Sequence, residues 1–518
     1  MVRPLLEARG VYKAFGDNVA LDHVNFSIRK GEIHGLLGEN GAGKTTLMNI
    51  IYGLYKADEG EILIDGKKVT ISSPKDAIKK KIGMVHQHFT LVPEYTVLEN
   101  IILGMKRGEK FSPTLCSNEE KNKILKMSER FGLKFPLDAK IKELPMGVRQ
   151  RVEIARVLHR GAEILILDEP TSSLVPHEVD TLFDSLRIMV KKGLTIVFIT
   201  HKIREAMSVC DRLTVLRGGK VRCILSRKEM TPSKLVSMMV GERIDAEKSI
   251  IYGKLRKKIS LVRPQKRPIL TIRNLFVSGG KGTFAVKKCS FEVFGGEIFG
   301  MAGVSGNGQK ELLDAILKLK KAEKGDIIVD GKNVKDLSTC DILDLGTVYI
   351  PEDRIAEGVL PTVTVAENLI LGYQDQFCKK RFLLSWLDLK SLRNTSKKLI
   401  CDYEIKTPDE KALARTLSGG NIQRLMLARA FSQPAKLLIA HDPTKGLDVA
   451  FTELVLKKLV ECKNKGAAVL WICEDLDQLL LVSDRIGVIY GGENVGVLKR
   501  KEFNKYKIGM AMTGVKRI

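Results

Sequence analysis

The sequence predicts an α/β fold that occurs twice along a chain of 518 residues. Short apolar runs, such as Ile33–Leu37 and Ile164–Leu167, alternate with helical patterns, which is typical of parallel strands covered by helices on both faces. Two glycine-rich segments, 38–43 and 303–308, share one spacing of glycines and stand 265 residues apart. The chain therefore contains two copies of one domain of about 240 residues.

The two copies divide the chain into three parts. Residues 1–241 are predicted to form the first domain and residues 268–518 the second, because matched pairs such as Asp211-Arg212 and Asp484-Arg485 continue the repeat with small insertions. Residues 242–267 are predicted to form a basic linker, since they are rich in lysine and arginine.

Composition excludes several classes of protein. Apolar residues make up 44% and charged residues 28%, as in ordinary globular chains, and no apolar run reaches the about 18–20 residues of a membrane helix. The start lacks the apolar stretch of a signal peptide, and nine cysteines occur without a Cys-x-x-Cys pair, so we expect a cytosolic chain with reduced thiols. The net charge of +25 indicates an anionic neighbour, either nucleic acid or acidic lipid, or else simply a lysine-rich solvent face.

The first chemical signal is a glycine-rich loop directly after the strand Ile33–Leu37 and before a helical run. Its glycines let backbone N–H groups surround a polyphosphate, while Lys44 neutralises the β- and γ-phosphates and Thr45 ligates Mg²⁺. The alternative is a glycine-rich turn without a ligand, which the strand, loop and helix context disfavours. The residues expected to bind the nucleotide are Gly38, Glu39, Asn40, Gly41, Ala42, Gly43, Lys44, Thr45 and Thr46.

The second signal is a pair of carboxylates, Asp168 and Glu169, at the end of the apolar strand Ile164–Leu167. Consecutive side chains on a strand face opposite ways, so the two acids have different roles. Asp168 is suited to hold Mg²⁺, and Glu169 to polarise the water that attacks the γ-phosphate. An acidic pair can also be a helix cap or a surface turn, but the phosphate loop in the same domain favours the catalytic interpretation.

Three further motifs resemble the ATP-binding cassette (ABC) ATPases, and the resemblance covers essentially the whole length of both copies. Gln87 resembles the Q-loop residue of this family, and His201 its switch histidine, which senses the γ-phosphate. In the second copy the signature loop supplies Ser418, Gly419, Gly420 and Asn421 as ATP contacts. The resemblance implies tandem ABC-type P-loop NTPase domains, each with a parallel RecA-like core, a helical subdomain and an antiparallel β subdomain, with ATP and Mg²⁺ as cofactors.

Some aromatic residues and histidines admit two interpretations. His201 could be an ordinary strand-end histidine, but its position after the acidic pair recurs in the second copy, which favours the sensor role. Phe15 resembles the adenine-stacking aromatic residue of the family, with core packing or Tyr12 in its place as alternatives. His86 and His88 could share a strand face and bind a metal ion, but no third ligand is indicated nearby.

The two copies are not chemically equal. Gln309 stands in place of Lys44 and Lys310 in place of Thr45, so the second copy lacks the phosphate lysine and the Mg²⁺ hydroxyl. Lys310 does not restore the lysine, because one helix position turns a side chain by about 100°. In the first copy, Pro145 replaces the signature serine. The degenerate second site is expected to comprise Gly303, Gly306, Gly308, Gln309, His441, Asp442 and Glu474.

ABC domains resemble one another in pairing head to tail, with each ATP between one phosphate loop and the signature loop of the other copy. Under that pairing every defect falls in one site, so we predict one complete composite site and one that does not hydrolyse ATP. The expected catalytic residues are Glu169, His201 and Gln87, and the expected Mg²⁺ ligands are Thr45, Gln87 and Asp168. The degenerate site keeps Gly306 and Gly308, whose backbone could still bind ATP.

Segments such as Pro351–Arg354 and Cys473–Leu476 resemble the tandem ATP-binding subunits of bacterial simple-sugar importers of the ribose and galactose type. Within that group, His86–Phe89 and Gly303–Gln309 look closer to the nucleoside branch. The resemblance implies a peripheral ATPase on the cytoplasmic face of the inner membrane, docked on two transmembrane permease subunits and served by an extracytoplasmic solute-binding protein. Its positive charge would then face an anionic membrane surface, and Gln87 would couple the ATP site to the permease.

Two other classes are alternatives. Soluble tandem ABC ATPases that act on ribosomes or DNA also need basic surfaces, but they resemble each other in having two competent phosphate loops and either a longer linker or large inserts. A non-hydrolysing scaffold is opposed by the complete set of Lys44, Asp168, Glu169 and His201. We therefore expect no nucleic-acid partner, and the choice between sugar and nucleoside rests on resemblance.

Overall fold

The computed structural model describes residues 3–16, 18–87, 89–104, 118–240, 250–251, 264–280, 282–381, 384–515 and 517. The chain forms two compact units, Met1–Ala246 and Glu247–Ile518, which are considered one at a time. Most of the basic linker predicted at 242–267 lies outside the described residues.

The core of the first unit is a six-stranded sheet with five parallel strands and one antiparallel edge strand. In spatial order the strands are β10 (Lys220–Ser226), β9 (Arg212–Arg217), β3 (Ile33–Leu37), β8 (Thr195–Thr200), β7 (Ile164–Asp168) and β6 (Ile82–Val85). Every residue of β3, β7 and β8 is buried, which explains their continuous apolar sequences. Because these strands are parallel, the loops that follow them lie together at the carboxyl-terminal end of the sheet.

An antiparallel sheet shares its core with this parallel sheet. Its strands, in spatial order, are β2 (Asn18–Ile28), β1 (Leu6–Phe15), β4 (Glu59–Ile64) and β5 (Lys67–Val69). Leu47 and Met48 of helix α1 (Lys44–Ile51) belong to the same buried cluster as Phe26 of β2 and Ile166 of β7. Both sheets thus anchor α1, and this fixes the direction of the phosphate loop that precedes it.

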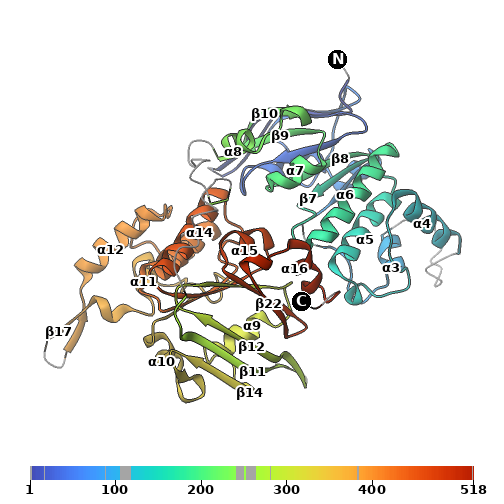
Figure 1. Ribbon diagram of the computed structural model, residues 1–518. Coiled ribbons are helices and arrows are strands. Elements are labelled where there is room, and N and C mark those ends of the chain that lie inside the picture. Colours follow the sequence, from blue (N-terminus) through green and yellow to red (C-terminus); the bar gives the residue numbers. More distant parts are fainter. Residues whose placement is uncertain are drawn as a thin grey trace. The chain divides into compact units, whose positions relative to one another are not determined.

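The other helices of the first unit are α2 (Pro74–Lys79), α3 (Val97–Ile102), α4 (Asn118–Phe131), α5 (Met146–His159), α6 (Pro176–Lys191), α7 (Ile203–Val209) and α8 (Pro232–Val240), with 3-10 turns at Ile141–Glu143 and Arg227–Glu229. Helices α3, α4 and α5 pack together as a helical subdomain (Figure 1). Thr96 starts α3 with a capping box, because its hydroxyl accepts from the N–H of Glu99 while the Glu99 carboxylate accepts from the N–H of Thr96.

The second unit repeats both sheets in the same strand order. Its six-stranded sheet contains β22 (Glu493–Lys499), β21 (Arg485–Tyr490), β13 (Ile298–Ala302), β20 (Ala468–Cys473), β19 (Leu437–His441) and β16 (Thr347–Ile350). Its antiparallel sheet contains β12 (Thr283–Phe294), β11 (Pro268–Gly280), β14 (Ala322–Val329) and β15 (Lys332–Asn333). The predicted α/β fold with two similar copies is therefore confirmed.

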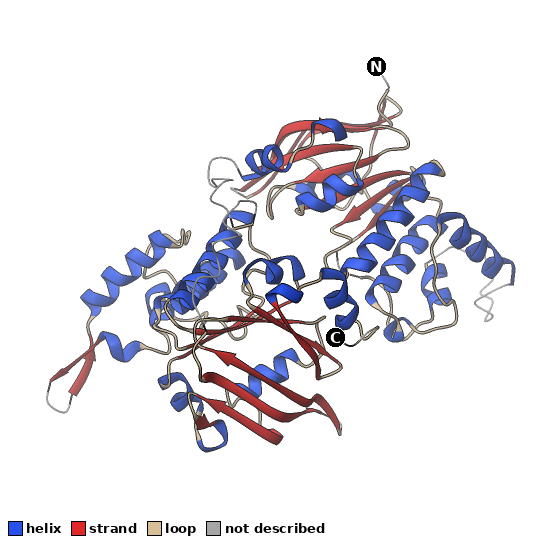
Figure 2. Ribbon diagram, viewed as in Figure 1, coloured by secondary structure: helices blue, strands red, loops and turns tan. Residues whose placement is uncertain are grey.

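The helices of the second unit are α9 (Gln309–Ile316), α10 (Thr339–Asp344), α11 (Val365–Ile370), α12 (Leu389–Asp402), α13 (Gly419–Ser432), α14 (Val449–Asn464), α15 (Leu476–Val482) and α16 (Lys505–Met512), with 3-10 turns at Val334–Asp336, Gln374–Phe377, Ala414–Thr416 and Arg500–Glu502. A separate hairpin of β17 (Cys378–Arg381) and β18 (Leu384–Leu387) projects beyond α12 (Figure 2). Within the described ranges, no helix has the length and apolar character needed to cross a bilayer. The described cysteines are free thiols, while Cys116 lies outside the described residues.

Candidate active site

The phosphate loop of the first unit joins β3 to α1, where the sequence predicts it. Gly41 and Gly43 adopt φ angles of 79° and 99°. A Cβ atom on Gly43 would lie 2.5 Å from the carbonyl oxygen of Ala20, so only glycine fits at this position. The loop can therefore turn tightly in front of the N-terminus of α1, a place where backbone N–H groups and the helix dipole favour an anion.

Lys44 is buried within this loop. Its Nζ donates hydrogen bonds to the carbonyl oxygens of Gly38 and Glu39, both at 2.9 Å. Burial lowers the pKa of Lys44, while the nearby charges of Glu169 and Asp168 oppose the shift. The ammonium group is thus held over the loop, where it can neutralise a bound phosphate.

The end of β7 faces the start of α1. Oγ1 of Thr45 donates a hydrogen bond to Oδ2 of Asp168 at 3.1 Å. Burial raises the pKa of Asp168, and the hydrogen bond from Thr45 partly offsets this effect. A hydroxyl and a carboxylate side by side are oxygen donors of the type that Mg²⁺ prefers, so this pair fits the ion that the sequence predicts here.

Glu169 lies between Gln87 and His201, the residues predicted to be the Q-loop glutamine and the switch histidine. Its Oε1 lies 2.9 Å from Nδ1 of His201, and its Oε2 accepts a longer hydrogen bond of 3.4 Å from Nε2 of Gln87. Burial raises the pKa of Glu169, but the hydrogen bond and charge of His201 and the charge of Lys44 outweigh it, so the net pKa is lowered. The carboxylate is therefore ionised at neutral pH, as a general base must be.

Glu205 supports this cluster and was not found from the sequence. Its Oε2 accepts hydrogen bonds from Oγ1 of Thr171 at 2.6 Å and from Oγ1 of Thr200 at 3.3 Å. Thr171 follows Glu169 by two residues and Thr200 directly precedes His201. Glu205 thus joins the segments that carry Glu169 and His201. One acidic residue in a helix carries no pattern, so the fold alone identifies it.

Phe15, the predicted adenine-stacking residue, lies at the end of β1 with 44% of its surface exposed. One ring contact is edge-on to Tyr55, at a centroid distance of 5.4 Å. The paired strand β2 passes beside the phosphate loop, so an exposed ring is available near that loop. The rival Tyr12 is partly buried. His86 and His88 were considered as a pair of metal ligands, and His88 lies outside the described residues.

The signature loop of the second unit is exposed at the N-terminus of α13. Ser418 is the residue before the helix, and Gly419 and Gly420 follow it. Nδ2 of Asn421 donates to Oγ of Ser418 at 3.0 Å, and a Cβ on Gly420 would meet no atom within 4 Å. An exposed hydroxyl beside open glycines at a helix N-terminus is suited to contact phosphate.

In the first unit, a carboxylate of the protein, that of Glu178, occupies the corresponding loop. Pro145 precedes α5, so this position offers no backbone N–H. The N–H of Gly147 donates to Oε1 of Glu178 at 3.1 Å, and Oε2 of the same carboxylate accepts from the N–H of Val175 at 3.2 Å. The proline was predicted from the sequence, whereas Glu178 was not, and its carboxylate places a negative charge at the N-terminus of α5.

The phosphate loop of the second unit is closed by its own side chains. Nε2 of Gln309 donates to the carbonyl oxygen of Val304 at 2.9 Å, and its Oε1 accepts from the N–H of Asn307 at 2.9 Å. Lys310, in the position of Thr45, forms an ion pair with Glu357. Neither residue presents a free cation or a hydroxyl, so this loop lacks the pair of lysine and threonine that Lys44 and Thr45 form in the first unit.

The acidic pair of the first unit is also replaced in the second. His441 ends β19 in the place of Asp168, and Asp442 follows in the place of Glu169. The N–H of Glu474, which replaces His201, donates to Oδ1 of Asp442 at 3.0 Å. Burial and the charge of Glu474 raise the pKa of Asp442 to about 7. A second carboxylate thus stands where the first unit has an imidazole, and Asp442 lacks the partner that keeps Glu169 ionised.

Both units match one known protein family, and relatives match the chain over nearly its whole length. The sequence model of the family described as "ABC transporter" matches residues 21–172 and 286–445. The nucleoside import ATP-binding protein NupA of Lactococcus lactis is 41% identical over 97% of this chain and 97% of its own length. The guanosine import ATP-binding protein NupO of Bacillus subtilis is 40% identical over 98% and 97%. The ribose import ATP-binding protein RbsA of Bacillus licheniformis is 34% identical over 98% and 99%.

Proposed function

Because the chain belongs to the ABC transporter family and is an ATPase coupled to transport, we propose that it is the ATP-hydrolysing subunit of an importer with one catalytic site. The cluster of Gln87, Glu169 and His201 beside Lys44 carries this proposal. The second unit has Gln309 in the place of Lys44, and Asp442 and Glu474 in the places of Glu169 and His201. Its chemistry supports binding at most, and not hydrolysis.

The predicted site residues of the first unit have distinct roles in the proposed reaction. Lys44 and the backbone N–H groups of the phosphate loop hold the β- and γ-phosphates. Glu169 accepts the proton of the attacking water, while His201 keeps that carboxylate ionised and in place. Thr45, Asp168 and Gln87 would hold Mg²⁺, which neutralises charge on the phosphates when it is bound.

We further propose that the signature loop starting at Ser418 completes this site from the second unit. The exposed Ser418 hydroxyl and the open Gly420 support this assignment. The opposite combination would join the loop blocked by Glu178 to the loop closed by Gln309. Pairing across the two units therefore collects all the intact features in one composite site and all the altered features in the other.

The proposed solute is a nucleoside, and the proposed partners are two transmembrane permease subunits with an extracytoplasmic solute-binding protein. The names of two relatives and the segments His86–Phe89 and Gly303–Gln309 support the nucleoside. A peripheral ATPase on the cytoplasmic face of the membrane would also bring its net charge of +25 close to anionic lipid, which contributes about 1 kcal/mol for each nearby Lys or Arg.

Reconstitution tests this function. The chain is purified together with its membrane subunits, placed in proteoliposomes and assayed for uptake of radiolabelled guanosine and ribose. We expect ATP-dependent guanosine uptake that disappears with Glu169→Gln. Uptake of ribose in place of guanosine would assign a sugar as the solute. Recovery of ribosomal or DNA material in place of membrane subunits would contradict the importer.

A further inference from the structure

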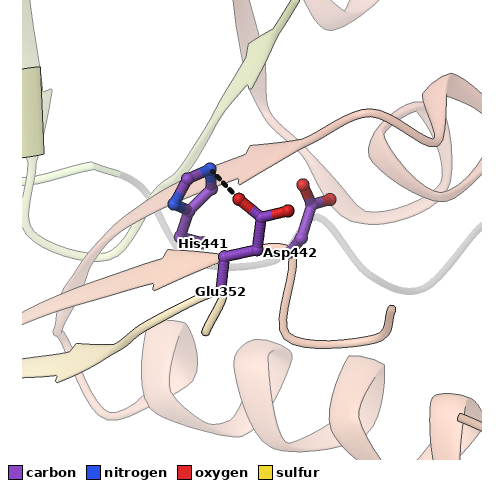
Figure 3. A group of neighbouring side chains, drawn as sticks. All are labelled: Glu352, His441 and Asp442. Carbon is purple, nitrogen blue, oxygen red and sulfur yellow. Dashed lines mark ion pairs between the residues drawn. The ribbon is translucent and has the colours of Figure 1, made fainter. Parts of the chain in front are cut away.

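Three side chains of the second unit converge at the end of its parallel sheet. Glu352 stands two residues after β16, as Gln87 stands two residues after β6, and His441 and Asp442 end and follow β19. One donor atom from each lies within 4.8 Å of the other two. Figure 3 shows the imidazole and both carboxylates gathered at one point. We call these three residues the His441 cluster.

The imidazole of His441 is largely buried beside Glu352. Only 8% of its side chain is exposed, and its Nε2 lies 3.7 Å from Oε2 of Glu352. A neutral imidazole is the commonest metal ligand in proteins. Two ligand atoms that are each about 2.0–2.2 Å from one zinc-type ion lie about 3–4 Å apart, so this spacing suits an ion bound between the imidazole and the carboxylate.

The two carboxylates are held by contacts that leave oxygens available. Oε1 of Glu352 accepts a hydrogen bond from Nζ of Lys445 at 2.6 Å, while Oε2 faces His441. Oδ1 of Asp442 accepts the N–H of Glu474. Contacts of this kind orient the ligands of a metal ion without occupying every coordinating atom.

The charges around the cluster also favour a cation. Glu352, Asp442 and Glu474 bring three carboxyl groups, and the nearby ammonium group is that of Lys445, which lies 3.8 Å from Glu474. Lys310, the next cation, is paired with Glu357. A divalent ion would reduce the excess of carboxylates.

We propose that the His441 cluster binds a divalent transition-metal ion of the zinc type. One imidazole and two carboxylates suit Zn²⁺, Co²⁺ or Ni²⁺, whereas Mg²⁺ prefers oxygen donors throughout. The two units then differ in metal preference at equivalent positions, with Mg²⁺ in the first and a zinc-type ion in the second. The proposal does not depend on which unit hydrolyses ATP or on the transported solute.

Metal binding by the full, untagged chain tests the proposal. The protein is stripped with a chelator, dialysed against Zn²⁺ without ATP and analysed by mass spectrometry, and Co²⁺ binding is followed by visible absorption. We expect His441→Gln to bind one equivalent less than the wild type, or to bind it about 10-fold or more weakly. As a control outside the cluster, Cys340→Ser should retain the wild-type zinc stoichiometry.

Two further variants keep the test decisive if His441→Gln unfolds, which a thermal melt detects. Glu352→Gln should also lose the ion, because it removes a ligand and restores the residue type of Gln87. Lys445→Met should bind Zn²⁺ more tightly, because it removes a competing cation. Equal zinc binding by wild type, His441→Gln and Glu352→Gln would place the ion elsewhere, such as at the exposed Cys340, and would overturn the proposal.

Discussion

Nδ1 of His201 lies 2.9 Å from Oε1 of Glu169 in the first unit. The equivalent positions of the second unit hold Glu474 and Asp442, and the backbone N–H of Glu474 donates to Oδ1 of Asp442 at 3.0 Å. An imidazole beside a carboxylate favours the ionised base, whereas a second carboxylate opposes it. This difference underlies the expected division of labour between the two units.

Replacing Glu169 with glutamine should remove the general base and keep the shape of the side chain. We expect ATP turnover to fall by about 10²- to 10⁴-fold, with binding of radiolabelled ATP retained. Phosphate release at saturating ATP measures the first quantity and filter binding the second. The matched variant of the second unit, Asp442→Asn, should keep most of the turnover. Equal losses in both variants would mean that the second unit is also catalytic.

Lys44 and Gln309 occupy equivalent positions but should differ in importance. Lys44→Ala removes the cation that holds the phosphates, so both ATP binding at the first unit and turnover should be lost. Gln309→Ala opens hydrogen bonds within one loop and should leave most of the turnover intact. Steady-state phosphate release measures the ATP turnover of the two variants. A loss in Gln309→Ala as large as that in Lys44→Ala would refute the single catalytic site.

Ser418 should affect a reaction whose other residues belong to the first unit. Ser418→Ala removes a hydroxyl expected to donate to the γ-phosphate, and we expect turnover to fall by about 10²-fold. Pro145→Ala, at the matching position of the first unit, should have little effect because Glu178 still occupies that loop. Turnover of Ser418→Ala that matches the wild type would contradict the composite site.

His34 is fully buried in β3, and we expect it to make the stability of the first unit sensitive to acid. Nε2 lies 2.7 Å from Oγ1 of Thr214, and Nδ1 lies 3.2 Å from Oε1 of Glu32. Burial lowers the pKa of His34 from its ordinary 6.5, against the opposing influence of Glu32. Arg212, 3.0 Å from Glu32, supplies the positive charge that this carboxylate needs, so His34 stays neutral in the folded state.

Since the unfolded chain protonates this histidine below about pH 6.5 and the folded chain does not, the free energy of unfolding should fall as the pH drops below that value. His34→Gln should remove this part of the pH dependence. Urea denaturation at pH 7.5 and pH 5.5, followed by circular dichroism, measures the difference between the two proteins. Phe299 occupies the matching position of the second unit, which gives an internal control. An unchanged pH dependence in His34→Gln would exclude His34 as its source.

Sequence patterns predicted the local structure where residue types recur at a fixed spacing. The glycine-rich loop between β3 and α1, the acidic pair at the end of β7 and the loop before α13 all lie where the sequence predicts them. Residues that act through hydrogen bonds to distant segments had no such pattern. Glu205 and Glu178 are acidic residues in helices, and their importance depends on which loops the fold brings against them. The pairing of Lys310 with Glu357 likewise joins segments 47 residues apart.

The backbone at the end of the parallel sheet bends in the same way in both units. Glu169 adopts a φ of 46° and Asp442 a φ of 42°, a left-handed conformation that side chains other than glycine seldom adopt. Because this bend occurs both beside the pair of Glu169 and His201 and beside the altered pair of Asp442 and Glu474, the main-chain geometry belongs to the shared fold and does not depend on these side chains. Exchanging side chains between the two bends should therefore transfer or remove activity without a change in the backbone.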